Sequence, residues 1–247
     1  MTKRPTVHVT QVGGCKRKKY HEIMDKGKGM PPHFYGVKGT MCHKVIEKSI
    51  EKIKSSEPVE IDITYPNLLD TSKGRNKKVS KEVYQACLPE VESLMTKTDV
   101  WLETQEYDLN EFTSEETLEV VLDECVIKGT PDLYSNSTLI DFKSGKPVMR
   151  KEYIRQAAAY KWMLKRKKDI DITECHIIFF GGDEPVDKVI PALKLEEGLK
   201  QFFTDLREHL CTGRLVREGG VKDKYQFKCS NDFMCTMCNF RNICSGI

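Results

Sequence analysis

With 247 residues and a formal net charge of +3, the chain can form one larger domain or two small ones. Its hydrophobic content of 39% and its charged content of 31% are ordinary for a globular protein and exclude a disordered or fibrous chain. The sequence has no apolar run long enough for a membrane span and no secretory signal behind Met1, so we expect a cytoplasmic protein that does not enter a membrane.

The first half of the chain predicts helices separated by an irregular segment. Apolar residues recur at helical spacing in residues 40–55, with charged residues between them. Residues 56–79 lack this periodicity and are rich in polar residues, with prolines among them, so we predict an irregular insertion there. Ser80 is a good N-cap residue for a second helix that runs to about Lys97.

The pattern then changes to strands. Runs rich in β-branched and aromatic residues predict strands at residues 101–107, 117–122, 125–134 and 137–143. Turn-forming residues separate the last two runs and favour an antiparallel hairpin. We further expect a helix at 151–168, strands at 174–180 and 188–190, a helix at about 195–210 and an irregular tail from Arg214. This order predicts a single α/β domain over residues 1–247, with a mixed central β-sheet flanked by helices.

Charge is distributed unevenly along the chain. Basic residues cluster at 16–19, 73–81 and 143–168, whereas residues 103–124 are strongly acidic. A basic run can meet a polyanion, but it is also typical of a solvated face. The nearly balanced total charge therefore gives only weak support for a nucleic-acid partner.

The most informative segment is the predicted hairpin, which contains Gly-Thr-Pro-Asp132 and then Asp141-Phe-Lys143. Because residues two apart share a face of a strand, Asp141 and Lys143 point the same way, while Ile140 and Phe142 face the core. The hairpin brings Asp132 close to Asp141. Two carboxylates and a lysine are therefore expected to converge on one patch.

This combination suits cleavage of phosphate esters assisted by a metal. Mg²⁺ and Mn²⁺ prefer oxygen ligands and are commonly held by one or two carboxylates. A nearby ammonium group can orient or help deprotonate the attacking water and offset developing negative charge. The alternative is a surface hairpin with an ordinary Asp–Lys pair, since short Asp-X-Lys matches arise often by chance.

Further polar residues lie at suitable places before and after the hairpin. His43 and Glu47 are four residues apart on the first predicted helix, and the imidazole of His43 can be a metal ligand. Gln156 and Tyr160 are likewise four apart on one helix face, where they can hold a lysine or a nucleotide. We expect basic side chains near the same opening to contact phosphates, namely Arg150, Lys151 and Arg155.

Four ordered motifs, Gly-X-X-X-His, Gly-X-Pro-Asp, Asp-X-Lys-X-Gly and Gln-X-X-X-Tyr, resemble the RecB-like branch of the PD-(D/E)XK nucleases. The resemblance implies a restriction-endonuclease-like fold and metal-dependent cleavage of DNA. It also implies that the catalytic residues are Asp132, Asp141, Lys143, Gln156 and Tyr160, and that the metal ligands are His43, Asp132, Asp141 and the backbone carbonyl of Phe142.

The ten cysteines suggest a second metal site, because no export signal favours a disulfide framework. Cys235, Cys238 and Cys244 supply three soft ligands within ten residues. The fourth is Cys15, which would clasp the two ends of the chain, or the local alternative Cys229. Four thiolates suit zinc or an iron-sulfur cluster equally. The remaining cysteines are expected to be small core residues, namely Cys42, Cys87, Cys125, Cys175 and Cys211.

One early cysteine and three late ones around a nuclease core resemble the CRISPR-associated exonucleases and the AddB-type nucleases. That resemblance implies a [4Fe-4S] cluster held by Cys15, Cys235, Cys238 and Cys244, with residues 1–38 and 214–247 forming the cluster region. It also implies single-stranded DNA or frayed duplex ends as substrate, a role in spacer acquisition or in viral or plasmid recombination, and CRISPR integrase proteins as partners. The alternatives are a non-catalytic nucleic-acid-binding module stabilised by zinc or a cluster, and a restriction-type endonuclease.

Overall fold

The computed structural model describes residues 4–24, 34–55, 81–220 and 244. The predicted insertion at residues 56–79 lies outside this range, as do Ser80, Cys229, Cys235 and Cys238. Within the described residues, no helix is both long and apolar enough to span a membrane.

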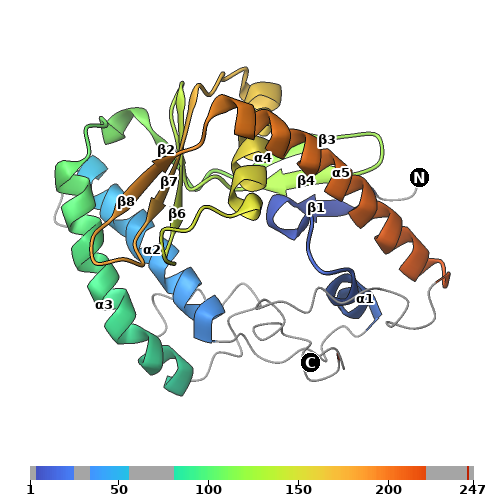
Figure 1. Ribbon diagram of the computed structural model, residues 1–247, viewed down its shortest axis with the longest axis horizontal. Coiled ribbons are helices and arrows are strands. Elements are labelled where there is room, and N and C mark those ends of the chain that lie inside the picture. The colour runs from blue at the N-terminus through green and yellow to red at the C-terminus, as the bar shows by residue number, and fades with distance from the viewer. Residues whose placement is uncertain (1–3, 25–33, 56–80, 221–243, 245–247) are drawn as a thin grey trace.

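Two sheets form the centre of the fold (Figure 1). The larger sheet has the order β2-β5-β6-β7-β8, in which only β6 and β7 are parallel neighbours. The smaller sheet has the order β1-β4-β3. The strands span Thr6–His8 (β1), Thr113–Ser114 (β2), Leu118–Val121 (β3), Val126–Gly129 (β4), Leu133–Tyr134 (β5), Thr138–Lys143 (β6), Glu174–Phe179 (β7) and Val186–Val189 (β8). The expected mixed α/β architecture is therefore confirmed.

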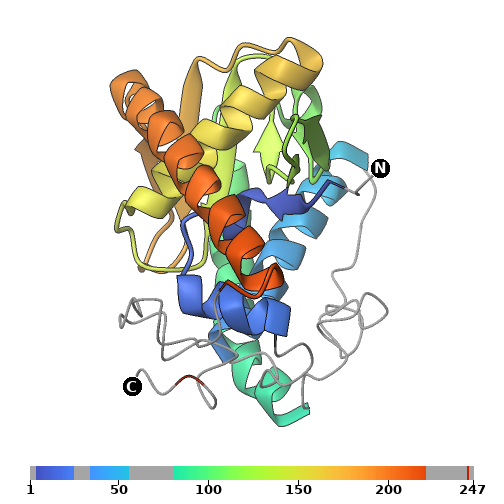
Figure 2. The same ribbon diagram turned by 90° about the vertical axis from the view of Figure 1, so that its right-hand side faces the viewer.

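Helices cover the larger sheet on both faces (Figures 1 and 2). The pair α2 and α3 covers one face, and the pair α4 and α5 lies on the other side, with α1 packed against α5. The helices span Lys16–Met24 (α1), Phe34–Ser55 (α2), Lys81–Thr104 (α3), Lys151–Lys168 (α4) and Ala192–Arg217 (α5), and short 3-10 helices occupy Val9–Gln11 (η1) and Leu109–Glu111 (η4).

The alternation of side chains along β6 divides the protein into two cores. Ile140 and Phe142 join the apolar cluster beneath α2 and α3. Leu139 belongs to the cluster beneath α4 and α5, which also includes the smaller sheet. Asp141 and Lys143 share the face of Leu139, because residues two apart in a strand point the same way. The strand therefore directs these two polar side chains toward α4.

The predicted strand at residues 101–107 is wrong. Residues 101–104 form the last turn of α3, and η4 follows after a short irregular segment. The buried residues Leu94, Thr98 and Trp101 continue the helical spacing of α3. The Trp101 ring packs edge-on against Phe142, with 5.2 Å between ring centroids. Tertiary packing against the sheet thus overrides the strand preference of these residues.

The predicted strand at residues 125–134 is divided into two. β4 pairs with β1 and β3, whereas β5 pairs with β2 and β6, so the chain crosses from one sheet to the other at Thr130–Asp132. Pro131 lies at this crossing and has no amide hydrogen for a strand ladder. The predicted antiparallel hairpin of the last two strands is confirmed, since Leu133 pairs with Ile140.

Two further expectations need correction near the end of the chain. Helix α5 continues to Arg217, so the irregular tail does not begin at Arg214. Cys211 is exposed, because Thr212, Gly213 and Val216 form the buried face of this part of α5. The other four single cysteines are buried as expected, namely Cys42, Cys87, Cys125 and Cys175.

Candidate active site

The β5–β6 hairpin places Asp132 and Asp141 opposite each other at one end of the larger sheet. The register that pairs Leu133 with Ile140 sets Asp132 beside Asp141 on the neighbouring strand. The backbone amide of Phe142 donates a hydrogen bond of 2.7 Å to Asp132 Oδ2. This bond fixes one carboxylate oxygen and leaves Oδ1 facing α2.

His43 approaches Asp132 from α2. Its Nδ1 lies 3.5 Å from Asp132 Oδ1. The negative charge of Asp132 raises the pKa of His43 to about 9, against the opposing effect of burial. Burial acts to raise the pKa of Asp132, but His43, Lys143 and the Phe142 amide together outweigh it and hold that pKa below its usual value. Glu47, on the same helix face as His43, pairs instead with Lys44 at 2.7 Å.

Asp141 is almost fully buried, with 1% of its surface exposed, and Lys143 Nζ lies 2.5 Å from its Oδ2. Burial raises the pKa of Asp141. The positive charge of Lys143 acts to lower that pKa, but it offsets only part of the effect of burial. For Lys143, burial acts to lower the pKa, yet Asp141 and Asp132 outweigh it and raise the pKa. Despite the ion pair, neither Asp141 oxygen accepts a well-oriented hydrogen bond from the described residues.

Helix α4 holds Lys143 through a short chain of side chains. Lys143 Nζ donates to Gln156 Oε1 at 3.3 Å, and Gln156 Nε2 donates to the Tyr160 hydroxyl at 3.1 Å. Burial raises the pKa of Tyr160, so its hydroxyl stays protonated. A Cβ at Gly129 would lie 2.6 Å from the Tyr160 ring, so only glycine permits this close approach. The spacing of four residues therefore places both groups where the sequence predicted.

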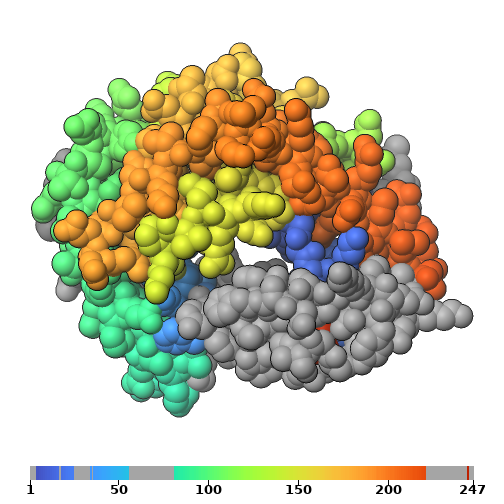
Figure 3. Space-filling model, in the orientation of Figure 1, coloured from blue at the N-terminus to red at the C-terminus, as the bar shows by residue number. Residues whose placement is uncertain are grey.

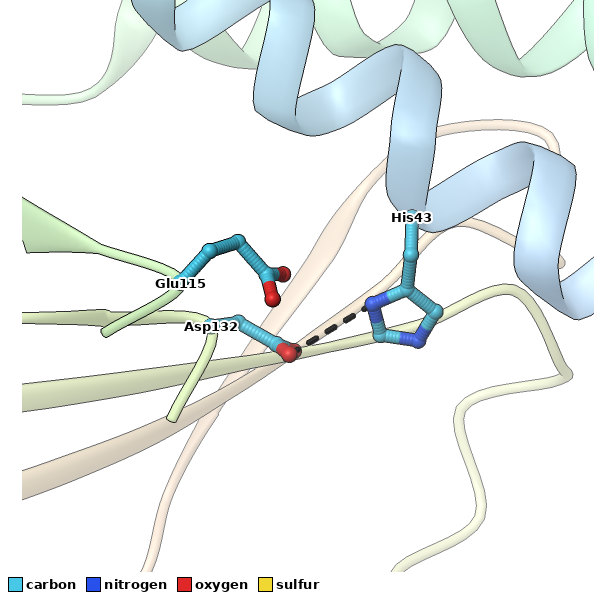
Figure 4. Close-up of side chains that lie close together, drawn as sticks. All are labelled: His43, Glu115 and Asp132. Carbon is cyan, nitrogen blue, oxygen red and sulfur yellow. Dashed lines mark ion pairs between the residues drawn. The ribbon is translucent and has the colours of Figure 1, made fainter. Parts of the chain in front are cut away.

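The structure adds a residue that the sequence motifs do not contain. Glu115 follows β2, and its carboxylate oxygen lies with His43 and Asp132 in a group whose ligand atoms are all within 4.8 Å of one another (Figure 4). Burial and the nearby Asp132 raise the pKa of Glu115 to about 7. The only signal in the sequence was the acidic character of residues 103–124, which does not single out one glutamate.

The three predicted phosphate-contacting residues have different surroundings. Arg150 and Lys151 are exposed at the start of α4. The segment that joins β6 to α4 lies on the surface beside them (Figure 3). Arg155 Nη1 instead lies 2.7 Å from Asp205 Oδ2 on α5, with both side chains mostly buried. The structure thus brings Arg150 and Lys151 to the surface and engages Arg155 in an ion pair between helices.

Of the four predicted cluster ligands, two lie in the part of the chain that the structure describes. Cys15 immediately precedes α1, and its carbonyl accepts a hydrogen bond of 3.1 Å from the Lys19 amide. Cys15 and Cys244 are both half-buried.

Sequence comparison decides the family. Residues 9–245 match the profile described as the PD-(D/E)XK nuclease superfamily. The chain belongs to this superfamily. It is therefore a nuclease by family, and a phosphodiester hydrolase by the chemistry that defines such enzymes. No curated protein matches the chain in sequence.

Solved structures similar to this nuclease have low sequence identity. The crystal structure of SSO0001 shares 14% identity at a TM-score of 0.44, and the alignment covers 99% of this chain and 88% of that chain. A Eubacterium rectale protein named a "putative exonuclease" shares 15% identity at a TM-score of 0.44, with coverage of 89% and 86%.

The donor groups of this nuclease fit the divalent metal that PD-(D/E)XK enzymes use. Asp132 Oδ1 and Glu115 offer oxygen, and His43 offers nitrogen, within one small group. Asp141 adds a buried Oδ1 that accepts no hydrogen bond from the described residues, while its Oδ2 is paired with Lys143. A buried acceptor oxygen without a partner is costly unless a donor or a cation satisfies it. Oxygen donors with one imidazole suit Mg²⁺ or Mn²⁺.

Proposed function

We propose that this protein is a metal-dependent deoxyribonuclease, mainly a single-strand exonuclease, that acts on single-stranded DNA or frayed duplex ends. One observation carries the proposal: Asp132, Asp141 and Lys143 converge at one end of the larger sheet, with His43 facing Asp132 from α2. In a PD-(D/E)XK nuclease, such a group supplies the cation site and the ammonium that hydrolysis of a phosphodiester requires.

His43, Asp132, Asp141 and the carbonyl of Phe142 would hold Mg²⁺ or Mn²⁺, which lowers the pKa of water and polarises the phosphate. Lys143 lies beside Asp141 and is positioned by Gln156, so its ammonium can orient the attacking water and offset charge on the phosphate. Tyr160 fixes the Gln156 amide and thereby the direction of Lys143. The Phe142 amide keeps Asp132 in place while Oδ1 remains available.

DNA would approach over the first turn of α4. Arg150 and Lys151 are exposed there, and a helix N-terminus favours a phosphate group. Binding that relies on such contacts weakens as salt concentration rises. Arg155 would support this surface from within, through its ion pair with Asp205, rather than contact phosphate directly.

For the cysteines, we propose a [4Fe-4S] cluster bound by Cys15, Cys235, Cys238 and Cys244, as in the CRISPR-associated exonucleases that the sequence resembles. The cluster would join residues 1–38 to residues 214–247 and have a structural role. On the same resemblance, the nuclease would process DNA ends before integration as spacers, with CRISPR integrase proteins as partners, or would serve viral or plasmid recombination.

Cleavage of end-labelled single-stranded DNA tests the nuclease assignment. Anaerobically purified wild type should degrade the DNA with Mg²⁺ or Mn²⁺ and show the brown absorption of an iron-sulfur protein. Lys143→Ala should lose cleavage but still bind DNA, whereas Lys200→Ala, at an exposed position of α5, should behave as wild type. An inactive wild type that binds DNA would identify a non-catalytic module. Discrete fragments from circular duplex DNA would identify a restriction-type endonuclease. A colourless protein that contains zinc would contradict the cluster.

A further inference from the structure

Glu115 stands apart from the motifs because the fold, and not the sequence pattern, brings it to the site. His43 comes from α2, Glu115 from the segment between β2 and β3, and Asp132 from the crossing between the two sheets. In Figure 4 the three side chains point toward a common centre. One ligand atom of each lies within 4.8 Å of the others, which is the spacing of atoms around a shared cation.

The backbone fixes Glu115 in this position. Its φ angle is 52°, in the left-handed region that side chains other than glycine, asparagine and aspartate rarely adopt. The Glu115 amide donates a hydrogen bond of 3.2 Å to the Asp132 carbonyl, and Ser114 pairs with Leu133 next to it. The two acidic residues are therefore anchored to each other through the main chain before any ligand binds.

The adjacent glutamate shows that this orientation is particular to Glu115. Glu116 turns away and accepts hydrogen bonds from the Tyr134 hydroxyl and from Lys168 Nζ. The carboxylate of Glu116 is thus satisfied by protein groups. Within the described residues, Glu115 instead lies among potential metal ligands.

The balance of charge supports a cation at this centre. Glu115, Asp132 and Asp141 bring three carboxylates to one region, in which Asp141 is buried, the other two are half-buried, and Lys143 pairs with Asp141. Three carboxylates around one ammonium leave an excess of acidic groups, which a divalent cation can offset. Asp141 gives a second, independent sign of a ligand, since its buried Oδ1 accepts no hydrogen bond from the described residues, whereas its Oδ2 lies 2.5 Å from Lys143 Nζ.

We propose that Glu115 is a direct ligand of the divalent cation, together with His43 Nδ1 and Asp132 Oδ1. This inference rests on the proposed nuclease function and adds a ligand to it. With Glu115 added to His43, Asp132, Asp141 and the Phe142 carbonyl, every donor belongs to the protein, so the cation can bind before DNA arrives. Glu115 therefore sets the affinity of the DNA-free enzyme for metal.

Binding of Mn²⁺ to the full-length protein without DNA tests the inference. The bound fraction is measured from the paramagnetic resonance signal of free Mn²⁺, so the readout does not depend on cleavage. Glu115→Gln should raise the Kd for Mn²⁺ by roughly tenfold or more. The matched control Glu111→Gln removes one charge from an exposed position of η4 and should leave the Kd unchanged. A Kd for Glu115→Gln within about twofold of wild type would overturn the proposal.

Thermal unfolding separates loss of a ligand from damage to the fold. Without metal, Glu115→Gln should unfold at the same temperature as wild type or at a higher one, because it removes repulsion with Asp132. The rise in Tm on adding Mn²⁺ should shrink in the variant. Glu115→Asp keeps the charge but has a shorter side chain, so its Kd for Mn²⁺ should lie between that of wild type and that of Glu115→Gln. A lower Tm without metal, combined with an unchanged rise on adding Mn²⁺, would assign Glu115 to the fold and overturn the proposal.

The outcome is distinguishable from failure of the nuclease assignment. If Lys143→Ala abolishes cleavage while Glu115→Gln binds Mn²⁺ as wild type does, the function stands and the extra ligand is rejected. If neither wild type nor any variant cleaves DNA, yet Glu115→Gln still loses Mn²⁺ affinity, the metal site stands without the nuclease.

Discussion

The two faces of strand β6 show that burial has opposite consequences for an apolar and for a charged side chain. Phe142 and Asp141 are neighbours in the chain and are almost equally buried, with 2% and 1% of their surfaces exposed. Phe142 packs against Trp101 beneath α2 and α3 in an apolar core. Asp141 faces α4, beside Lys143 and opposite Asp132. Burial of the Phe142 ring stabilises the fold, whereas burial of the Asp141 carboxylate costs free energy. One strand therefore supplies stability on one face and reactive chemistry on the other.

Asp141→Asn should give the largest effect and act only on the reactive face. Loss of the carboxylate should reduce DNA cleavage by at least about 10³-fold, because metal binding and the direction of Lys143 both depend on it. Burial raises the pKa of Asp141, so the charged carboxylate costs the folded protein stability at pH values above that raised pKa. We therefore expect Tm without metal to stay the same or increase. A large decrease in Tm would show that Asp141 supports the fold instead.

Phe142→Ala should have the opposite effect, lowering the stability of the fold while leaving the cleavage site in place. Removing the ring leaves a cavity beside Trp101 and Phe180 and should lower the free energy of unfolding by about 3–5 kcal/mol. The Phe142 amide remains, so its hydrogen bond to Asp132 is kept. Urea denaturation measures the stability, and activity is measured at a temperature where the variant is folded. If cleavage falls as far as it does in Asp141→Asn, the two faces are not separable.

Arg155→Ala tests the buried ion pair that joins α4 to α5. The loss leaves Asp205 without this partner and should reduce the free energy of unfolding by about 2–3 kcal/mol, since both side chains are mostly buried. The exposed pair Lys16–Glu208 is a matched control, and Lys16→Ala should cost less than about 1 kcal/mol. If Arg155→Ala keeps its stability but loses DNA affinity, Arg155 binds DNA directly.

The smallest expected effect is a pH dependence at the edge of the apolar face. His176 Nδ1 lies 2.9 Å from Asp187 Oδ2, and Glu174 and the Tyr107 hydroxyl also face the ring. Burial acts to lower the pKa of His176, but Asp187 and Glu174 outweigh it and raise the pKa above its usual value. A raised pKa of a histidine stabilises the fold fully below the unfolded-state pKa and no longer does so above the folded-state pKa.

Asp187→Asn should therefore lower the free energy of unfolding more at pH 6 than at pH 9. The comparison requires urea denaturation of wild type and variant at both values. An equal loss at the two pH values would show that the pair contributes through packing or a neutral hydrogen bond rather than through charge.

Local patterns in the sequence were sufficient wherever neighbours in the chain decide the structure. Alternation along residues 138–143 correctly separated Ile140 and Phe142 from Asp141 and Lys143, because side chains in a strand alternate between faces. The spacing of Gln156 and Tyr160 predicted their contact on α4 for the same kind of reason. The hairpin turn was likewise encoded locally, and it set Asp132 beside Asp141.

Predictions failed where distant parts of the chain compete. The segment 101–104 has strand-forming residues, yet it extends α3, because the helix buries Trp101 against Phe142 of the sheet. For Arg155, whose predicted contact with phosphate stays a prediction, the structure adds a partner that the sequence did not indicate, Asp205 on α5 at 2.7 Å. Pattern alone cannot anticipate such partners, because they lie tens of residues away in the chain.

The sequence by itself determined the β5–β6 hairpin, the helix that follows it and the pair of carboxylates with their lysine, since these depend on strand and helix periodicity. Only the tertiary structure decided which other acidic residue joins them. The chain crosses between two sheets at Asp132, and the left-handed backbone of Glu115 places its carboxylate against that crossing. That proximity follows from packing α2 and two sheets around one centre, and no local pattern of residues specifies it.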